Sequence, residues 1–322
     1  DDQPLDRDTG IRGISINYNA HPFEMQFITG RSTFVQSTIY APGFNNRFHN
    51  YSTSYNLYGI DLNYTLGNHL LGTSFLQSKE DHPDALADTL DLKNQLMSTH
   101  YTFNNTIYDF YLEYIMNRSF EFNKEDEYYQ QHVDGRGFYG NVSLYLDLFS
   151  LNIEYINYQF GTLDPLNRWD PVSNYGLFQP YQNPPIAMNI HENVLMNRIS
   201  HQTDFNNEVG FKAEFMGSLV DNIEFLAIYA QSNRTHTWIM NEDYTWQQQK
   251  KLSFFPSFDP TAMPFKEFYG ELIFHLLQNS LYLKIGYADS EDIVDLLQNT
   301  MTDTSQTLTY SIASARTFPL NL

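Results

Sequence analysis

The chain has 322 residues, no cysteine and a formal net charge of -20. The lack of cysteine excludes disulfides, thiolate metal sites and cysteine nucleophiles, and the acidic surface argues against a nucleic-acid partner, whose phosphates favour basic groups. No run of about 18 apolar residues occurs, which excludes a transmembrane helix, but a membrane β-barrel escapes this test because only every second residue of a strand faces lipid.

The first regular element is predicted at residues 14 to 19. Ile14, Ile16 and Tyr18 alternate with small polar residues, and this period of two predicts a strand with one apolar and one polar face. Residues 23 to 27 repeat the alternation after a short connection. Together the two segments predict a β-hairpin.

The same unit recurs along the chain. Further hairpins are predicted at residues 58–77, 97–116, 138–158, 209–229 and 268–287, followed by a last strand at 307–313. We therefore expect about 13 strands of roughly 8 to 11 residues, longer than the usual globular strand of about 5 to 6.

Short and long connections alternate without exception. The turns within hairpins are short, whereas the polar connections between hairpins span about 31–54, 79–95, 118–136, 161–207, 232–264 and 289–306. Outer-membrane barrels have short periplasmic turns and long external loops. The predicted fold is thus all-β, an antiparallel up-and-down transmembrane β-barrel, with residues 1–322 as a single domain and 161–207 as a long, ordered external loop.

A strand in hydrocarbon must have every backbone N–H and C=O paired, so a spanning sheet has to close. The odd number of predicted strands does not fit a closed antiparallel barrel. We therefore expect the chain to be an internal fragment, truncated at both ends, of a barrel of about 14 or more strands.

Three segments carry a family resemblance: DDQPLDRDTGIRGISINYN with FEMQFITGR, YQNPPIAMNIHENVLMNR with DFNNEVGFKAEF, and FKEFYGELIF. They resemble a domain-of-unknown-function family of outer-membrane β-barrels from the Bacteroidota and related phyla. In that family an NPP motif precedes a histidine and an LMNR-like segment, matched here by His191 and 195–198. The resemblance implies the barrel architecture and the outer membrane of a Gram-negative bacterium, and it implies no activity.

The segment 181–202 mixes stiff and apolar residues. Pro184 and Pro185 favour an extended backbone, and the apolar residues that follow predict a segment packed over or into the barrel mouth. His191 and Arg198 are then a hydrogen-bonded latch or a partner contact. A zinc site is not expected, because His191-Glu192 begins like H-E-x-x-H but residue 195 is leucine.

The polar positions of the strands form the second candidate site. By alternation they are expected to line the lumen, and the charged candidates are Glu24, Asp61, Asp109, Glu113, Glu154, Lys212, Glu214, Glu224, Glu271, His275 and Lys284. One interpretation is an acidic channel that favours cations, since rings of carboxylates select by charge. The other is a lumen filled by paired charges and tyrosines.

No catalytic motif is found, so no enzyme activity and no cofactor are predicted. The acidic clusters at 80–84 and 125–127 allow calcium as an alternative to a solvated surface, although neither matches an EF-hand.

Three functions remain open at this level. The leading hypothesis is a pore or transport channel with an acidic lumen, in contact with the lipid bilayer and lipopolysaccharide. The second is a non-conducting scaffold whose long loops hold lipoproteins or other surface proteins. The third is a soluble β-sandwich that binds glycans.

Overall fold

The computed structural model describes residues 11–36, 51–81, 90–123, 128–159, 207–240, 246–250, 253–259, 262–276, 281–298, 308–317 and 320–321. The chain divides into two compact units. The first comprises 1–101, 114–136 and 168–182, and the second comprises 102–113, 137–167 and 183–322. Each unit is described by itself.

The first unit is an antiparallel meander in which each strand pairs with its sequence neighbour. Its strands are β1 (Ile11–Ala20), β2 (Phe23–Gln36), β3 (Tyr51–Leu66), β4 (His69–Asp81) and most of β5 (Leu90–Asn104). Two further strands, β6 (Tyr108–Asn123) and β7 (Tyr128–Tyr145), contribute residues to both units.

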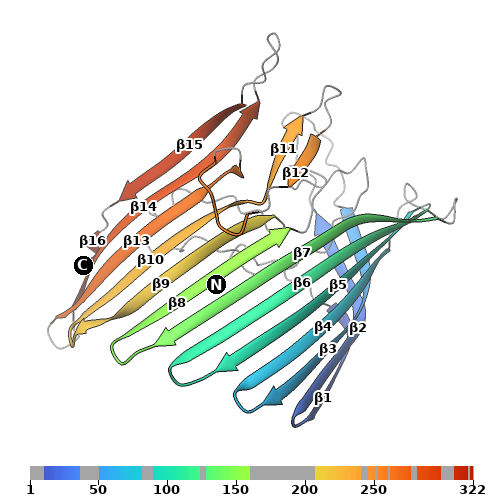
Figure 1. Cartoon of the computed structure of the whole chain (residues 1–322), viewed down its shortest axis with the longest axis horizontal. Coiled ribbons are helices and arrows are strands. Elements are labelled where there is room, and N and C mark those ends of the chain that lie inside the picture. Colours follow the sequence, from blue (N-terminus) through green and yellow to red (C-terminus); the bar gives the residue numbers. More distant parts are fainter. Residues whose placement is uncertain are drawn as a thin grey trace. The chain divides into compact units, whose positions relative to one another are not determined.

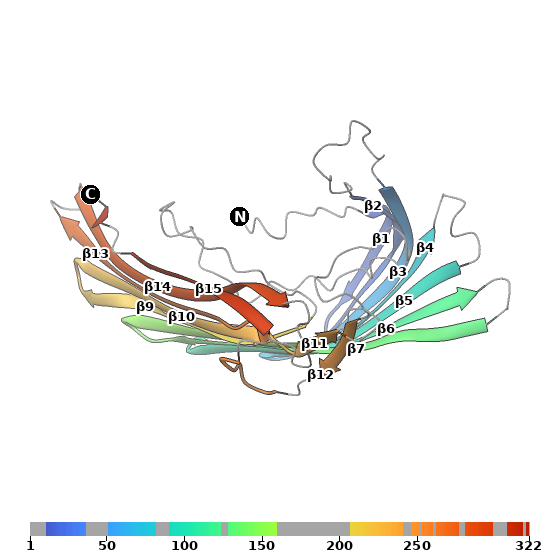
Figure 2. The ribbon, with the colours of Figure 1, turned by 90° about the horizontal axis from the view of Figure 1, so that it is seen from above.

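The second unit continues the antiparallel pattern, and its strands lie as a layer in the view of Figure 2. The strand order is β8 (Phe149–Gln159), β9 (Glu208–Val220), β10 (Ile223–Arg234), β13 (Phe265–Leu276), β14 (Leu281–Gln298) and β15 (Leu308–Thr317). The two-residue strand β16 (Leu320–Asn321) also pairs with β14, while β11 (His236–Met240) and β12 (Trp246–Lys250) form a separate hairpin.

Each of the predicted strands has a counterpart in the structure, and the short turns that join β1 to β2, β3 to β4, β5 to β6 and β7 to β8 are visible in Figure 1. In the turn between β3 and β4, Gly67 has a φ of 58°, a left-handed conformation that glycine adopts without steric cost. Closure is not seen: among the described strands, β1 pairs only with β2 and β15 only with β14. No helix in the described part of the chain is long and apolar enough to cross a membrane.

The strands are longer than the sequence predicted. They reach 18 residues in β7, and the connection expected at 118–136 is largely taken up by the ends of β6 and β7. The connection expected at 232–264 likewise contains β11 and β12, which hold Trp238 and Trp246. The reason is that polar residues still make the backbone hydrogen bonds of a ladder, so a strand continues where the apolar alternation stops.

The strand register keeps the apolar and polar faces separate. In the first unit, Met25 lies opposite Leu62 and Phe27 opposite Ile60, whereas the polar Gln26 lies opposite Asp61. A slip of one residue would place every side chain on the other face. The register therefore builds one continuous apolar face from the alternation of the separate strands.

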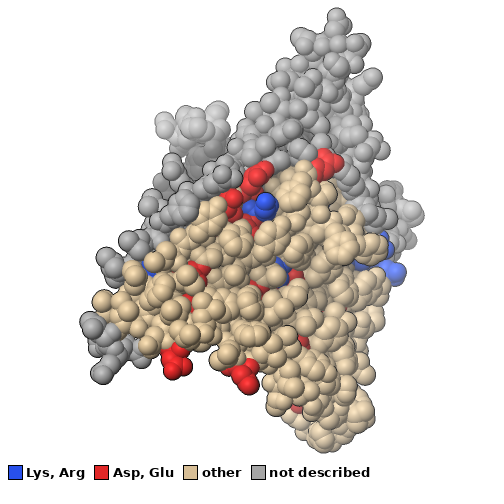
Figure 3. All heavy atoms as spheres, turned by 60° about the vertical axis from the view of Figure 1, so that its left-hand side comes forward, with Lys and Arg blue, Asp and Glu red and all other residues tan. Residues whose placement is uncertain are grey.

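The apolar face is exposed in both units. Ile14 is 64% and Phe23 59% exposed. Other large exposed residues on this face include Ile16, Tyr18, Met25, Phe27, Tyr58, Leu62 and Leu71 in the first unit and Phe149, Ile153, Phe215, Phe268, Leu272, Leu276, Leu281 and Ile285 in the second. On the face seen in Figure 3, residues other than Lys, Arg, Asp and Glu cover most of the described surface.

Aromatic side chains reinforce the apolar face of the second unit. The rings of Phe149 and Phe215 lie 5.5 Å apart, and those of Phe215 and Phe225 lie 4.8 Å apart. Such cross-strand pairs each contribute about 0.2–1 kcal/mol to sheet stability. They help to fix the register on the exposed apolar face.

The β8 and β9 strands pack closely around Gly217 of β9. A Cβ at this position would lie 2.7 Å from the Cβ of Phe149 and still closer to the backbone oxygen of Leu148. We expect Gly217→Ala to lower the free energy of unfolding by about 1–3 kcal/mol, the usual cost of overpacking. Urea unfolding followed by circular dichroism measures this change. The matched control is Gly270→Ala, where the nearest atom is 3.8 Å away, and an equal effect of both variants would contradict the prediction.

Candidate functional site: the polar face of the sheet

The predicted polar residues of the first unit lie on the face opposite the apolar one. Glu24 and Asp61 share this face through the pairs Glu24–Asn63 and Gln26–Asp61. Asp61 accepts hydrogen bonds from Asn63, at 2.6 Å, and from the hydroxyl of Ser74. Glu24 accepts one from Asn19 at 3.3 Å and remains exposed. Asp61 is thus held by its neighbours, whereas Glu24 is open to water.

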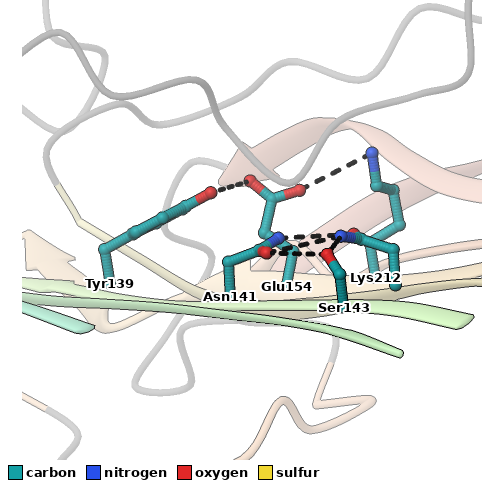
Figure 4. A network of polar contacts seen from close by, with 6 residues as sticks. Tyr139, Asn141, Ser143, Glu154 and Lys212 are labelled. Carbon is teal, nitrogen blue, oxygen red and sulfur yellow. Dashed lines mark hydrogen bonds and ion pairs between the residues drawn. The ribbon is translucent and has the colours of Figure 1, made fainter. Parts of the chain in front are cut away.

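In the second unit a buried carboxylate lies at the centre of a polar network (Figure 4). Glu154 on β8 is only 8% exposed and lies opposite Lys212 on β9. The ammonium of Lys212 is 3.5 Å from one carboxylate oxygen, and the hydroxyl of Tyr139 on β7 donates to the other at 3.0 Å. A buried charge needs such partners, because losing its hydration costs several kcal/mol.

The network continues beside Glu154 through amide and hydroxyl groups. Asn152 donates to the hydroxyl of Ser143 at 2.8 Å, and the amides of Asn141 and Asn152 lie within 3.3 Å of each other. These residues come from β7 and β8 and point to the same side as Glu154 (Figure 4). Short polar side chains therefore fill this part of the face.

The same arrangement recurs at Glu271. The hydroxyl of Tyr269 donates to one oxygen of Glu271 at 2.6 Å, and the ammonium of Lys284 lies 3.9 Å from the other. Each of these two carboxylates therefore has a tyrosine on one oxygen and a lysine near the other. Both charges are partly neutralised before any ion or partner approaches.

Two further predicted acids also accept hydrogen bonds. Glu113 is buried and accepts a hydrogen bond from Tyr111 at 3.0 Å, and the Tyr111 ring lies edge-on to that of Tyr139, with centroids 5.8 Å apart. Asp109 accepts a hydrogen bond from the backbone N–H of Asn105 at 3.3 Å.

Two more acids lie on the same face at β9 and β10. Glu214 lies opposite Asn152 and is half-buried. Glu224 lies 3.2 Å from the ring of His275, and its side chain is 51% exposed. The acids of this unit thus range from the buried, paired Glu154 to the exposed Glu224.

Sequence reasoning found the charged residues and expected tyrosines beside them, but it did not pair a particular tyrosine with a particular acid. A signal was present: Tyr111 and Glu113, like Tyr269 and Glu271, are separated by one residue. Residues two apart on a strand point to the same face, so a Tyr-x-Glu pair predicts a hydrogen bond along one strand. Tyr139 and Glu154 lie on different strands, and no local spacing links them.

Some predicted residues are outside the described part of the chain. They are Pro184, Pro185, His191 and Arg198, most of the loop 161–207, and the acidic residues at 82–84 and 125–127. Within the described ranges, no group of three or more histidines and carboxylates is placed to hold a metal.

The Glu154 network yields a stability prediction. Lys212→Met leaves a buried carboxylate without its cation, and we expect the free energy of unfolding to fall by about 1–3 kcal/mol. Adding Glu154→Gln should recover most of this loss, because the neutral amide still accepts from Tyr139. Urea titrations of the single and double variants measure both effects, and a double variant less stable than the single one would refute the pairing.

Comparisons with known proteins give a likeness of arrangement only. No protein-family model matches the chain, and no curated protein matches it. Among solved structures, it is similar to a mutant of the ferric enterobactin receptor PfeA from Pseudomonas aeruginosa, with 9% identity over 94% of this chain and 56% of the receptor, at a TM-score of 0.37. It is also similar to CdiB from Escherichia coli, with 8% identity over 98% of this chain and 62% of CdiB, at a TM-score of 0.27. Both TM-scores are below 0.5, so neither likeness assigns a family or an activity.

Proposed function

We propose that the chain forms part of an outer-membrane β-barrel whose apolar face contacts lipid and whose polar face lines an aqueous interior. One observation carries the proposal: each unit exposes a continuous face of large apolar side chains opposite a face of polar and charged ones. This is the alternation of a transmembrane barrel strand.

The energetic cost of exposing the apolar face to water supports a lipid environment. Moving one large apolar side chain out of water lowers the free energy by about 1.5–3 kcal/mol. A monomeric soluble protein rarely exposes a contiguous apolar patch of more than a few hundred Å². A sheet with the exposed rows described above would be driven to associate in water, and a bilayer removes that cost. The soluble glycan-binding sandwich is therefore the weakest of the three hypotheses.

Strand length is also consistent with a bilayer. Apart from the short β11, β12 and β16, the described strands run from 10 residues in β1 to 18 in β7, and a tilted strand needs about 9–11 residues to cross the hydrocarbon core. The longer strands would then extend beyond the membrane, on the side opposite the short turns. That side is the external one in outer-membrane barrels, where lipopolysaccharide would be the lipid partner.

The polar face favours a pore with a preference for cations. The predicted set on this face has eight carboxylates, from Glu24 to Glu271, against two lysines and His275. The two most open acids are Glu24 and Glu224. Fixed carboxylates beside an aqueous path attract cations and repel anions.

A second candidate is a non-conducting scaffold that binds lipoproteins or other surface proteins. It is favoured by the paired state of Glu154 and Glu271 and by the burial of Tyr158 and Tyr269. Packed tyrosines and neutralised charges would fill an interior rather than open it.

Planar-bilayer recording separates the two candidates. We expect the full-length protein to give conductance steps whose reversal potential in a KCl gradient indicates a preference for potassium. The double variant Glu24→Gln with Glu224→Gln should shift the reversal potential toward zero, because two exposed charges leave the ion path.

Glu291→Gln is the matched control for this experiment. Glu291 lies on the other face of β14, beside Lys266 of β13, so its removal should leave the selectivity unchanged. A membrane-inserted protein that remains silent would support the scaffold. Release from cells without detergent would contradict both barrel hypotheses.

A further inference from the structure

Residues 253–259 form an unusual segment between β12 and β13, here called the phenylalanine strap. The strap belongs to the second unit and lies against one side of the sheet layer in Figure 2. It contains Phe254, Phe255 and Phe258, whose exposed fractions are 79%, 70% and 56%. Three phenylalanines this open on one short segment require an explanation, because each leaves a large apolar area in water.

Side chains of the sheet hold the strap in place. The hydroxyl of Tyr155 donates to the backbone oxygen of Phe254 at 2.6 Å, and the amide of Asn157 donates to that of Ser253 at 3.0 Å. On the other side, the backbone N–H of Ser257 donates to the amide oxygen of Asn233 at 2.8 Å. The strap is therefore docked on β8 and β10.

These contacts place the strap on the apolar face. Asn157 and Asn233 both lie opposite Val209 of β9, and Tyr155 lies opposite Phe211. Val209 is fully buried between the two asparagines. The apolar row of β8 ends at Tyr155 and is followed by Asn157. The strap thus crosses the face at the level where it changes from apolar to polar.

The strap also satisfies much of its own backbone. Besides the three contacts above, the hydroxyl of Ser253 donates to the backbone oxygen of Phe255 and accepts from the backbone N–H of Phe255, the latter at 3.3 Å. Backbone groups that enter lipid must have partners, because no water is there to supply them. In the strap, the backbone oxygens of Phe254 and Phe255 and the N–H of Phe255 have such partners.

A cation lies beside the aromatic rings. Lys266 of β13 points to the same face, and its ammonium lies 5.9 Å from the centre of the Phe258 ring. Aromatic residues gather at membrane–water interfaces, and lysines there extend their charge toward the headgroups. The pair of Lys266 and Phe258 fits the boundary between acyl chains and lipid phosphates.

We infer that the phenylalanine strap is a bilayer anchor, which inserts Phe254 and Phe255 into the lipid at the membrane boundary and places Lys266 near the phosphates. The inference rests on the proposed barrel, since it requires the apolar face of the sheet to contact lipid. Continuity with that face favours lipid over a protein partner: the strap is bonded to Tyr155, which lies opposite Phe211 on this face, and its exposed phenylalanines extend the apolar surface.

The absence of cysteine from the chain permits a direct test by single spin labels. Nitroxide is attached to Phe255→Cys, and collisions with oxygen and with a water-soluble nickel chelate are measured in the intact protein, with any cysteine outside this chain changed to serine. The vesicles contain phosphatidylcholine and phosphatidylglycerol. Ile153→Cys, on the apolar face of β8, reports the sheet itself, and Asp147→Cys, at an exposed position in the turn before β8, reports water.

We expect the Phe255 label to collide mainly with oxygen, close to the behaviour of the Ile153 label and unlike the Asp147 label. If the Ile153 label is in lipid while the Phe255 label collides with nickel, or is shielded from both reagents by protein, the strap inference is wrong and the barrel proposal stands. If the Ile153 label itself collides mainly with nickel, the apolar face of the sheet is in water, and the proposed barrel is contradicted independently of the strap.

A second variant keeps the test independent of folding. Tyr155→Phe removes only the hydroxyl that holds the backbone of Phe254, so the sheet should remain intact. In the Phe255→Cys background, this change should increase both the mobility of the label and its collisions with nickel. A label unaffected by Tyr155→Phe would show that the strap is not anchored as the structure indicates.

Discussion

The central constraint on this molecule is the exposed apolar face of its strands. A strand with alternating side chains always has two faces, and the paired registers align those faces across neighbouring strands. Once aligned, the apolar side chains of each unit form a surface that water does not stabilise. The polar side chains are at the same time collected on the opposite face. Both the lipid contact that we propose and the polar network follow from this single arrangement.

On the polar face, buried carboxylates are neutralised by side chains close to them in the sheet. Glu154 and Glu271 each have a tyrosine hydroxyl and a lysine ammonium, drawn from the same or neighbouring strands. A carboxylate held in this way contributes less to the field in an aqueous interior than an open one such as Glu24. The number of acids in the sequence therefore overstates the charge that would act on an ion in the proposed pore. Which acids are open matters more than how many are present.

At the edge of the apolar face, polar side chains are likewise satisfied by local partners, here by the phenylalanine strap. Asn157 and Asn233 would interrupt the apolar surface, but their amides bond the strap backbone instead. The side chains that the strap presents outward are phenylalanines. The strap thereby covers the two asparagines with apolar side chains. The hydrogen bonds that hold the strap on the sheet also satisfy part of its own backbone.

The sequence alone determined the strands, their two faces and the positions of the short turns, because a period of two is a local property of extended backbone. It did not determine where the strands end, since polar residues remain in a ladder as long as a neighbour supplies hydrogen bonds. Nor did it find the pairing of Tyr139 with Glu154 or the docking of the strap, which joins Tyr155 to Phe254 across 99 positions. The strap fell within a predicted loop, residues 232–264. Such contacts depend on register and on how a loop returns to the sheet, and only the tertiary structure decides these, because they arise between residues far apart in the chain.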